Sequence, residues 1–213
     1  MPLHKVVRIV YAAIVLLIVP TLAHAQEAGV KAGINSASLT PEEDEDPDMS
    51  RRIGFVGGGW IRWSLSPRFS VQTEALFSEK GVTLKIPPIE EFPGGESEIR
   101  IRYLEVPVLA RGDFSSAGST ARFFVVGGLA PAFELASRGW LRPEGDDERA
   151  RDIGDETKPF DLGLVGGAGI EFGPAVIEAR YTHGLLHINE DDNGDEDRIK
   201  NRVFSVMAGV RFR

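Results

Sequence analysis

Charged residues recur at alternate positions in several stretches of this chain, where they could form ion pairs. Alternate side chains of a β-strand point to the same side, so these residues are predicted to face one enclosed space. Charges in a medium of low dielectric constant are tolerated only when they are paired. The expected chemistry is therefore a salt-bridged plug, with a narrow ion path as the alternative. The predicted inward-facing set is Lys31, Arg62, Glu74, Arg100, Arg102, Glu105, Arg111, Glu134, Glu171, Glu178, Arg180 and Arg211.

An acidic stretch at residues 189–197 resembles the D-x-D-x-D-G pattern of calcium-binding loops. The twelfth position of such a loop is usually a bidentate glutamate, and here it is Lys200. A solvated acidic loop is therefore expected, with calcium binding as the weaker alternative, and no cofactor is predicted. The candidate calcium ligands are Asp191, Asn193, Asp195 and Asp197.

A serine–histidine pair is the arrangement that could give this chain hydrolase chemistry. His183 and His187 follow the N-terminal segment, and Ser205 is predicted on a neighbouring strand. His183 shares its parity with Ile177 and Tyr181, so it is expected to point away from Ser205. No Gly-x-Ser-x-Gly motif, phosphate-binding loop or zinc-ligand spacing is present. We therefore predict that the protein is not an enzyme.

The elements that must position these residues are strands, because apolar residues alternate with small or polar ones at a period of two. In the last stretch, the odd-numbered residues from Ser205 to Arg211 are small, polar or unbranched, and the even-numbered ones are mostly large and apolar. An apolar outer face and a polar inner face are what a closed barrel in lipid requires. The predicted strands are 28–37, 53–63, 69–80, 98–111, 121–136, 159–172, 175–188 and 202–212.

The connections between these strands alternate strictly between short and long. The short or uncharged set comprises 64–68, 112–120 and 173–174, and the long set comprises 38–52, 81–97, 137–158 and 189–201. With Glu98, the long set holds 23 of the 32 acidic residues. The predicted fold is therefore all-β, an eight-stranded antiparallel up-and-down transmembrane β-barrel. The rival is a soluble periplasmic barrel that binds an apolar ligand inside, in which the oily face would point inward.

One strand departs from simple alternation. The parity of its apolar residues changes between Tyr103 and Leu104, which predicts a β-bulge there, and Pro107 lacks a ladder donor. Aromatic residues are expected at the barrel wall, where lipid meets water. They are Trp60, Trp63, Tyr103, Trp140 and Tyr181.

Residues 1–25 have the features of a cleaved signal peptide: a basic start, an apolar run and the small-x-small sequence Ala23-His24-Ala25. The barrel domain is then expected over 26–213. Cleavage removes Lys5 and Arg8 and no acid, so the net charge moves from −8 to −10. This charge disfavours nucleic-acid binding. The chain has no cysteine, which excludes a disulfide framework and a thiolate site.

Several segments resemble the Bacteroidetes-type outer-membrane β-barrel domain, often labelled the porin or PorT-like family. The most specific is Arg102–Leu109, with its Tyr-Leu-Glu-Val-Pro core, and the others are 29–35, 69–78, 80–81, 178–181 and 203–206. The resemblance covers 28–212 and implies an eight-stranded outer-membrane barrel without implying an activity.

The sequence thus predicts an integral protein of the cell outer membrane with a side-chain-filled lumen. Its expected role is structural, adhesive or loop-mediated binding, and the alternative is a narrow porin-like channel for ions or solutes. Its expected partners are outer-membrane lipid and the barrel assembly machinery, and the expected oligomeric state is a monomer.

Overall fold

The computed structural model describes residues 27–41, 49–86, 94–115, 120–143, 149–152, 159–186 and 199–212. Within these ranges, no helix is both long enough and apolar enough to span a membrane. The described strands are β1 (Glu27–Pro41), β2 (Met49–Ser64), β3 (Phe69–Ile86), β4 (Gly95–Glu105), β5 (Val108–Phe114), β6 (Ala121–Pro143), β7 (Arg149–Asp152), β8 (Phe160–Phe172), β9 (Ala175–Gly184) and β10 (Ile199–Phe212).

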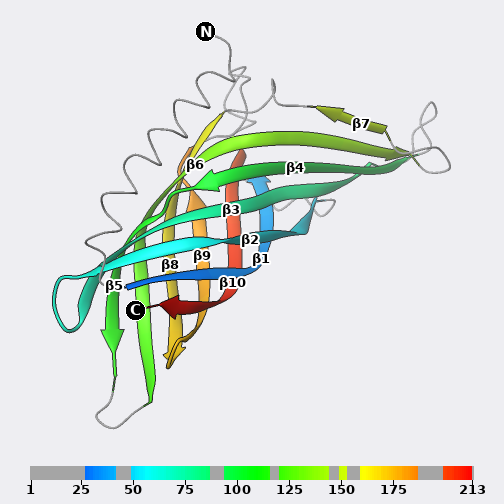
Figure 1. Cartoon of the computed structure of the whole chain (residues 1–213). Helices are drawn as coiled ribbons and strands as arrows, with labels where there is room; N and C mark the ends of the chain where they lie inside the picture. The colour runs from blue at the N-terminus through cyan, green and yellow to red at the C-terminus, as the bar shows by residue number, and fades with distance from the viewer. Residues whose placement is uncertain are drawn as a thin grey trace.

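The strands close into one antiparallel barrel because the first and last of them pair with each other (Figure 1). β1 pairs with β2 on one side and with β10 on the other, where Ala28 lies opposite Phe212. β4 and β5 are two parts of a single wall strand, since both pair with β3 in one unbroken register. The wall therefore has eight strands, and the predicted antiparallel barrel is confirmed.

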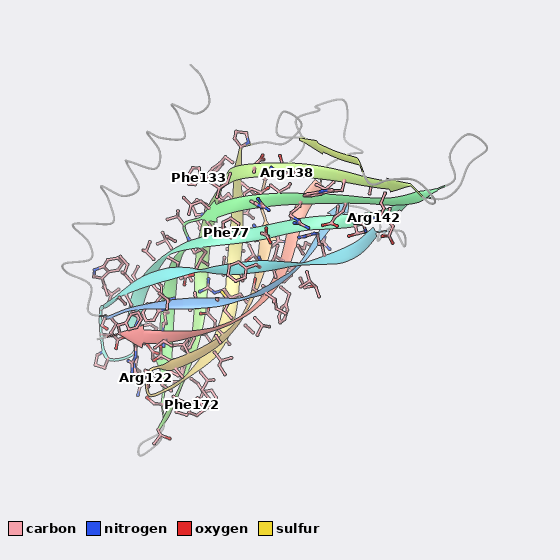
Figure 2. All side chains as sticks on the ribbon, turned by 45° about the vertical axis from the view of Figure 1, so that its right-hand side comes forward. Phe77, Arg122, Phe133, Arg138, Arg142 and Phe172 are labelled. Atoms are coloured by element: carbon pink, nitrogen blue, oxygen red, sulfur yellow. The ribbon has the colours of Figure 1, made fainter. Side chains whose placement is uncertain are left out.

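Large apolar side chains cover the outside of this wall. Phe69 is 63% exposed, whereas the next residue, Ser70, is 4% exposed, and the same alternation runs around the barrel. Figure 2 labels Phe77, Phe133 and Phe172 among the outer side chains. An apolar surface that encircles the molecule requires lipid rather than water around it. The predicted apolar exterior is confirmed, and the soluble rival with an oily interior is wrong. Further members of this belt are Val30, Ile34, Phe55, Val108, Phe123, Val125, Leu164, Ile177, Phe204, Val206, Val210 and Phe212.

The wall strand that contains Pro107 is interrupted only locally. Glu105 ends β4 and Val108 begins β5, yet the ladder continues through the gap. The Glu74 amide donates to the Pro107 carbonyl at 3.0 Å, and the Val106 amide donates to the Pro131 carbonyl at 2.8 Å. The interruption follows from the missing N–H of proline, not from a change in register.

A β-bulge is present at this level, but it lies in β6, so the prediction of a bulge between Tyr103 and Leu104 of β4 is wrong. Arg102 lies opposite Ala136 and Tyr103 lies opposite Glu134, so the extra residue is Leu135 of β6. Along β4 the alternation is uninterrupted. The apolar residues change parity because the surroundings change: beyond Tyr103 the interior becomes apolar and the outer face polar.

This change occurs where three strands project beyond the belt. β3, β4 and β6 extend past the other wall strands, and β7 pairs with the projecting part of β6 (Figure 1). The interior of the projection holds the apolar cluster of Val82, Ile101, Tyr103 and Ala132. Strand structure therefore enters the predicted loops 81–97 and 137–158. We call this end of the barrel the long-loop end. The opposite end, which carries the connections 64–68 and 173–174, is called the short-turn end.

Candidate functional site

A group of four buried charges spans the middle of the lumen, and we call it the central cluster. It consists of Lys31 on β1, Glu74 on β3, and Glu178 and Arg180 on β9. Their side chains are at most 4% exposed. All four were predicted to face inward, and strand alternation places Glu178 and Arg180, two residues apart, on the same side.

The contacts of the central cluster cross the full width of the barrel. Arg180 donates from Nη1 to Glu74 Oε2 at 2.7 Å and from Nη2 to Oε1 at 2.5 Å, a bidentate pair. β3 and β9 are four places apart in the ring of eight strands, so this pair joins opposite walls. Lys31 Nζ adds contacts of 2.8 Å to Glu74 and 3.1 Å to Glu178. Two cations and two anions thus balance.

A second cluster, the rim cluster, lies at the short-turn end. Its centre is Glu171 of β8, whose Oε1 accepts from Arg62 of β2 at 3.0 Å and from Arg111 of β5 at 2.7 Å. The Arg62–Glu171 pair again joins strands four places apart, hence opposite walls. Glu27 accepts from Arg211 at 2.6 Å and also contacts Arg62. Aromatic rings support the cations, with the Arg111 guanidinium 3.7 Å from the Phe124 ring centroid.

A cavity of about 300 Å³ opens beside the rim cluster. Glu27, Arg62, Ser70, Asp113 and Arg122 contribute polar groups to its lining. The rest of the lumen contains the central cluster and apolar side chains. The apolar groups form two clusters, one of Val56, Leu76 and Met207, and one of Leu109, Phe124, Val126, Ala130, Val165 and Val176.

Two further members of the predicted set, Glu105 and Glu134, lie toward the long-loop end, where the unpredicted Lys80 joins Glu105. Lys80 Nζ contacts Glu105 at 2.7 Å and stands 4.9 Å from the ring centroid of Tyr103. Glu134 accepts from Ser137 Oγ at 2.7 Å. Tyr103 is fully buried in the interior, so its predicted place among the lipid-facing aromatics is wrong. Trp60, 4% exposed, also departs from that prediction, and it packs beside Arg62.

Arg100 and Arg102 do not join the lumen charges, so that prediction is wrong. Their side chains are 29% and 37% exposed, while Ile101 and Tyr103 between and beyond them are buried. Without a bulge in β4, the even-numbered residues stay on the outer face. Arg100 contacts Glu98 at 3.0 Å and Arg102 contacts Glu79 at 3.1 Å on that face.

Several buried polar residues lie outside the predicted charge set because they are uncharged. Asn35 donates from Nδ2 to Ser78 Oγ at 2.9 Å, and Ser205 Oγ donates to Asn35 Oδ1 at 2.7 Å. Gln72 Nε2 donates to Glu74 Oε1 at 2.6 Å. Each shares its strand parity with a charged inward residue, and this parity is the signal that could have found them.

The serine–histidine arrangement is not assembled. Ser205 is bonded to Asn35 inside the barrel, while His183 follows the parity of Tyr181, which is 46% exposed on the outer face. His187 and the predicted calcium ligands Asp191, Asn193, Asp195 and Asp197 lie outside the described residues. Among the residues that are described, no group of three or more His, Asp or Glu side chains is arranged to hold a metal ion.

Several solved structures are similar to this chain. The chain resembles the crystal structure of Ail, the attachment invasion locus protein of Yersinia pestis, with 14% identity, a TM-score of 0.41, and coverage of 87% of this chain and 98% of Ail. Neisserial surface protein A, NspA, gives 11% identity, a TM-score of 0.46, and coverage of 87% and 97%. OprG from Pseudomonas aeruginosa gives 12% identity, a TM-score of 0.46, and coverage of 89% and 97%.

No curated protein matches the chain. A family model described as the outer membrane protein beta-barrel domain matches residues 22–190. This match agrees with the closed antiparallel wall and its apolar exterior, and it confirms the predicted location in the outer membrane. The chain therefore belongs to the outer membrane protein beta-barrel domain family.

Proposed function

We propose that this barrel is a non-conducting outer-membrane scaffold that acts through its long-loop end, in adhesion or loop-mediated binding. The observation that carries the proposal is the bidentate Arg180–Glu74 pair, which joins opposite walls with side chains 4% and 0% exposed. A contact across the diameter, with Lys31 and Glu178 bonded beside it, supports a lumen that is closed at this level. Eight strands enclose an interior about wide enough for side chains to fill, which supports the same conclusion.

The proposal is tested by single-channel recording in planar bilayers. We expect no stable conductance steps from protein whose folding is verified by its heat-dependent migration in SDS gels. A wide porin recorded in the same bilayers is the positive control. Large, stable steps from the folded protein would contradict a plugged lumen.

A narrow channel is the second candidate, and the cavity beside the rim cluster favours it. This cavity of about 300 Å³ reaches Arg62 from the short-turn end, so water has access to part of the lumen. For a channel, the central cluster would have to open. Small voltage-dependent currents that grow in a Glu74→Ala/Arg180→Ala variant, which removes the pair without changing the net charge, would identify such a gated path.

The projection of β3, β4 and β6 supports action at the long-loop end. It carries the wall beyond the apolar belt, with acid-rich connections predicted around it. An acidic rim would favour cationic partners. Replacing the acids of the 42–46 run with Gln and Asn should reduce the attachment of expressing cells to polycation-coated surfaces, most strongly at low salt. Unchanged attachment would argue against electrostatic adhesion by this loop.

The remaining assignments follow from the sequence and the membrane location. We infer cleavage after residue 25, a barrel domain over 26–213, insertion by the barrel assembly machinery, a monomeric state and no catalytic activity. The finer kinship with Bacteroidetes-type PorT-like barrels rests on the 102–109 segment. N-terminal sequencing of the exported protein tests the cleavage site, and light scattering in detergent tests the monomer.

A further inference from the structure

The charges around the rim cluster do not balance. Asp113 and Arg122 contact this cluster, and with them it holds four guanidinium groups and three carboxylates. The cations are Arg62, Arg111, Arg122 and Arg211, and the carboxylates belong to Glu27, Asp113 and Glu171. A guanidinium group keeps its proton in proteins. One positive charge is therefore left over at the short-turn end.

The excess charge belongs to Arg122. Each of the other three arginines donates to a carboxylate of the group at 2.6–3.0 Å. The ion pair of Arg122 with a described residue joins its Nη1 to Glu171 Oε2 at 4.0 Å, which is beyond hydrogen-bond distance. Glu171 already accepts from two other arginines through Oε1. Arg122 is therefore the cation that the rim cluster leaves without a close anion.

A ligand in water can reach Arg122. Its side chain is 39% exposed, whereas that of Arg62 is 2% exposed, and both arginines line the cavity of about 300 Å³ beside the rim cluster. Figure 2 shows Arg122 at the same end of the barrel as Phe172. Pockets that hold small molecules have volumes of about 300–1,000 Å³. The cavity therefore has room for a small ligand whose charged group contacts Arg122.

We propose that this cavity binds a small oxyanion with a single negative charge, and that Arg122 is its binding group. A guanidinium fork matches two oxygens of an oxyanion. One negative charge balances the excess, and a second would be repelled by Glu27 and Asp113, which also line the cavity. A carboxylate and a phosphodiester both carry one charge, and a phosphodiester can belong to a soluble molecule or to a lipid headgroup.

The acidic character of the whole chain does not oppose this site. With Glu98, the long connections hold 23 of the 32 acidic residues, and they are predicted on the far side of the apolar belt. Such a belt is about 25 Å tall, whereas the Debye length is about 8 Å at physiological ionic strength. The local excess at the short-turn end therefore decides the attraction. The proposal goes beyond the proposed function, which concerns the long-loop end.

The test uses the full-length mature protein, folded in a maltoside detergent that contains no phosphate. Acetate, dimethyl phosphate and, separately, chloride are titrated while NMR follows the Arg122 Nε–H signal and the backbone amide signals of residues 64–70. Short-chain phosphatidylglycerol is the probe for a lipid headgroup. Arg122→Gln removes the binding group, and Arg122→Lys keeps its charge without the fork. Arg138→Gln is the matched control, because it removes an equal charge from the same strand at the other end (Figure 2).

We expect saturable shifts with acetate and dimethyl phosphate in the parent and in Arg138→Gln. Arg122→Gln should bind both about tenfold more weakly, the usual effect of losing a charge-assisted hydrogen bond, and Arg122→Lys should lie between them. Shifts with the short-chain lipid alone would support the site and identify a headgroup as the source.

Three results would overturn the proposal: no saturable shift with any oxyanion, equal shifts with chloride, or equal affinity in the parent and Arg122→Gln. Every variant is first checked for heat-dependent gel migration. If Arg122→Gln does not fold, Arg122→Lys and the chloride comparison in the parent decide the result. None of these outcomes depends on whether the lumen conducts or the long-loop end adheres.

Discussion

Replacing Glu74 with Gln removes one charge from the central cluster and keeps the shape of the side chain. Glu74 accepts hydrogen bonds from Arg180, Lys31 and Gln72 at 2.5–2.8 Å. In the variant, two buried cations face only Glu178, which leaves one uncompensated positive charge. Breaking a buried ion pair by removing one partner costs about 3–5 kcal/mol. We expect the free energy of unfolding to fall by that amount.

The assay is urea-induced unfolding of the protein in lipid vesicles, with the folded fraction read from unboiled SDS gels. Glu79→Gln is the matched control, because Glu79 lies on the same strand but pairs with Arg102 on the outer face, where the arginine is 37% exposed. A partly exposed pair of this kind contributes about 0–1 kcal/mol.

A double variant, Lys31→Met with Glu74→Gln, restores the charge balance. The double variant should therefore lose less unfolding free energy than the two single variants lose together, and the difference should be about 0.5–3 kcal/mol. If Glu74→Gln costs no more than Glu79→Gln, the cross-lumen pair does not stabilise the barrel, and the reasoning is refuted.

Three further predictions concern the wall. Burial raises the pKa of Glu98, but hydrogen bonds from Arg52 and Arg100 outweigh this and leave the pKa below its usual value. The stabilising effect of Glu98 is therefore present above the unfolded pKa and lost as the pH falls through the folded pKa. The free energy of unfolding, measured at a series of acidic pH values, should show this loss, and Glu98→Gln should abolish it. Gly33→Ala should destabilise the barrel by about 1–3 kcal/mol in the unfolding assay, because the added Cβ would lie 1.9 Å from the Val206 carbonyl oxygen. Gly166→Ala is the control, and it should be neutral because the space around Gly166 is open. Ala208→Arg, on the belt of β10, should cost about 2–4 kcal/mol in vesicles, and a neutral result there would show that this face does not contact hydrocarbon.

The local sequence pattern was sufficient to predict the fold and most of the charged residues that face the lumen. Lys31, Glu74 and Glu178 alternate with apolar neighbours inside the belt, where lipid outside and charge inside make parity a reliable guide. The closed ring then follows, since every strand inside the membrane needs two neighbours for its backbone groups.

Parity failed at Arg100 and Arg102 because its meaning depends on what surrounds the strand. Beyond Leu104 the outer face meets water and headgroups instead of acyl chains, so the apolar residues turn inward and the arginines outward. The parity change at Tyr103 and Leu104 can arise either from a bulge or from the edge of the apolar belt, and the sequence of one strand does not distinguish the two. The position of that edge depends on how far β3, β4 and β6 pair with each other beyond the remaining strands.

The sequence by itself determined the alternation, the number of wall strands and the sign of the charge at each inward position, because these depend on residue type and a period of two. Only the tertiary structure decided which charges meet. Arg180 and Glu74 are 106 residues apart in the chain, and they pair because strand order and stagger bring β3 and β9 to opposite sides of one narrow lumen. The same stagger placed the extra residue in β6 rather than β4, since a bulge belongs to a pair of strands and one strand's sequence does not specify its partner.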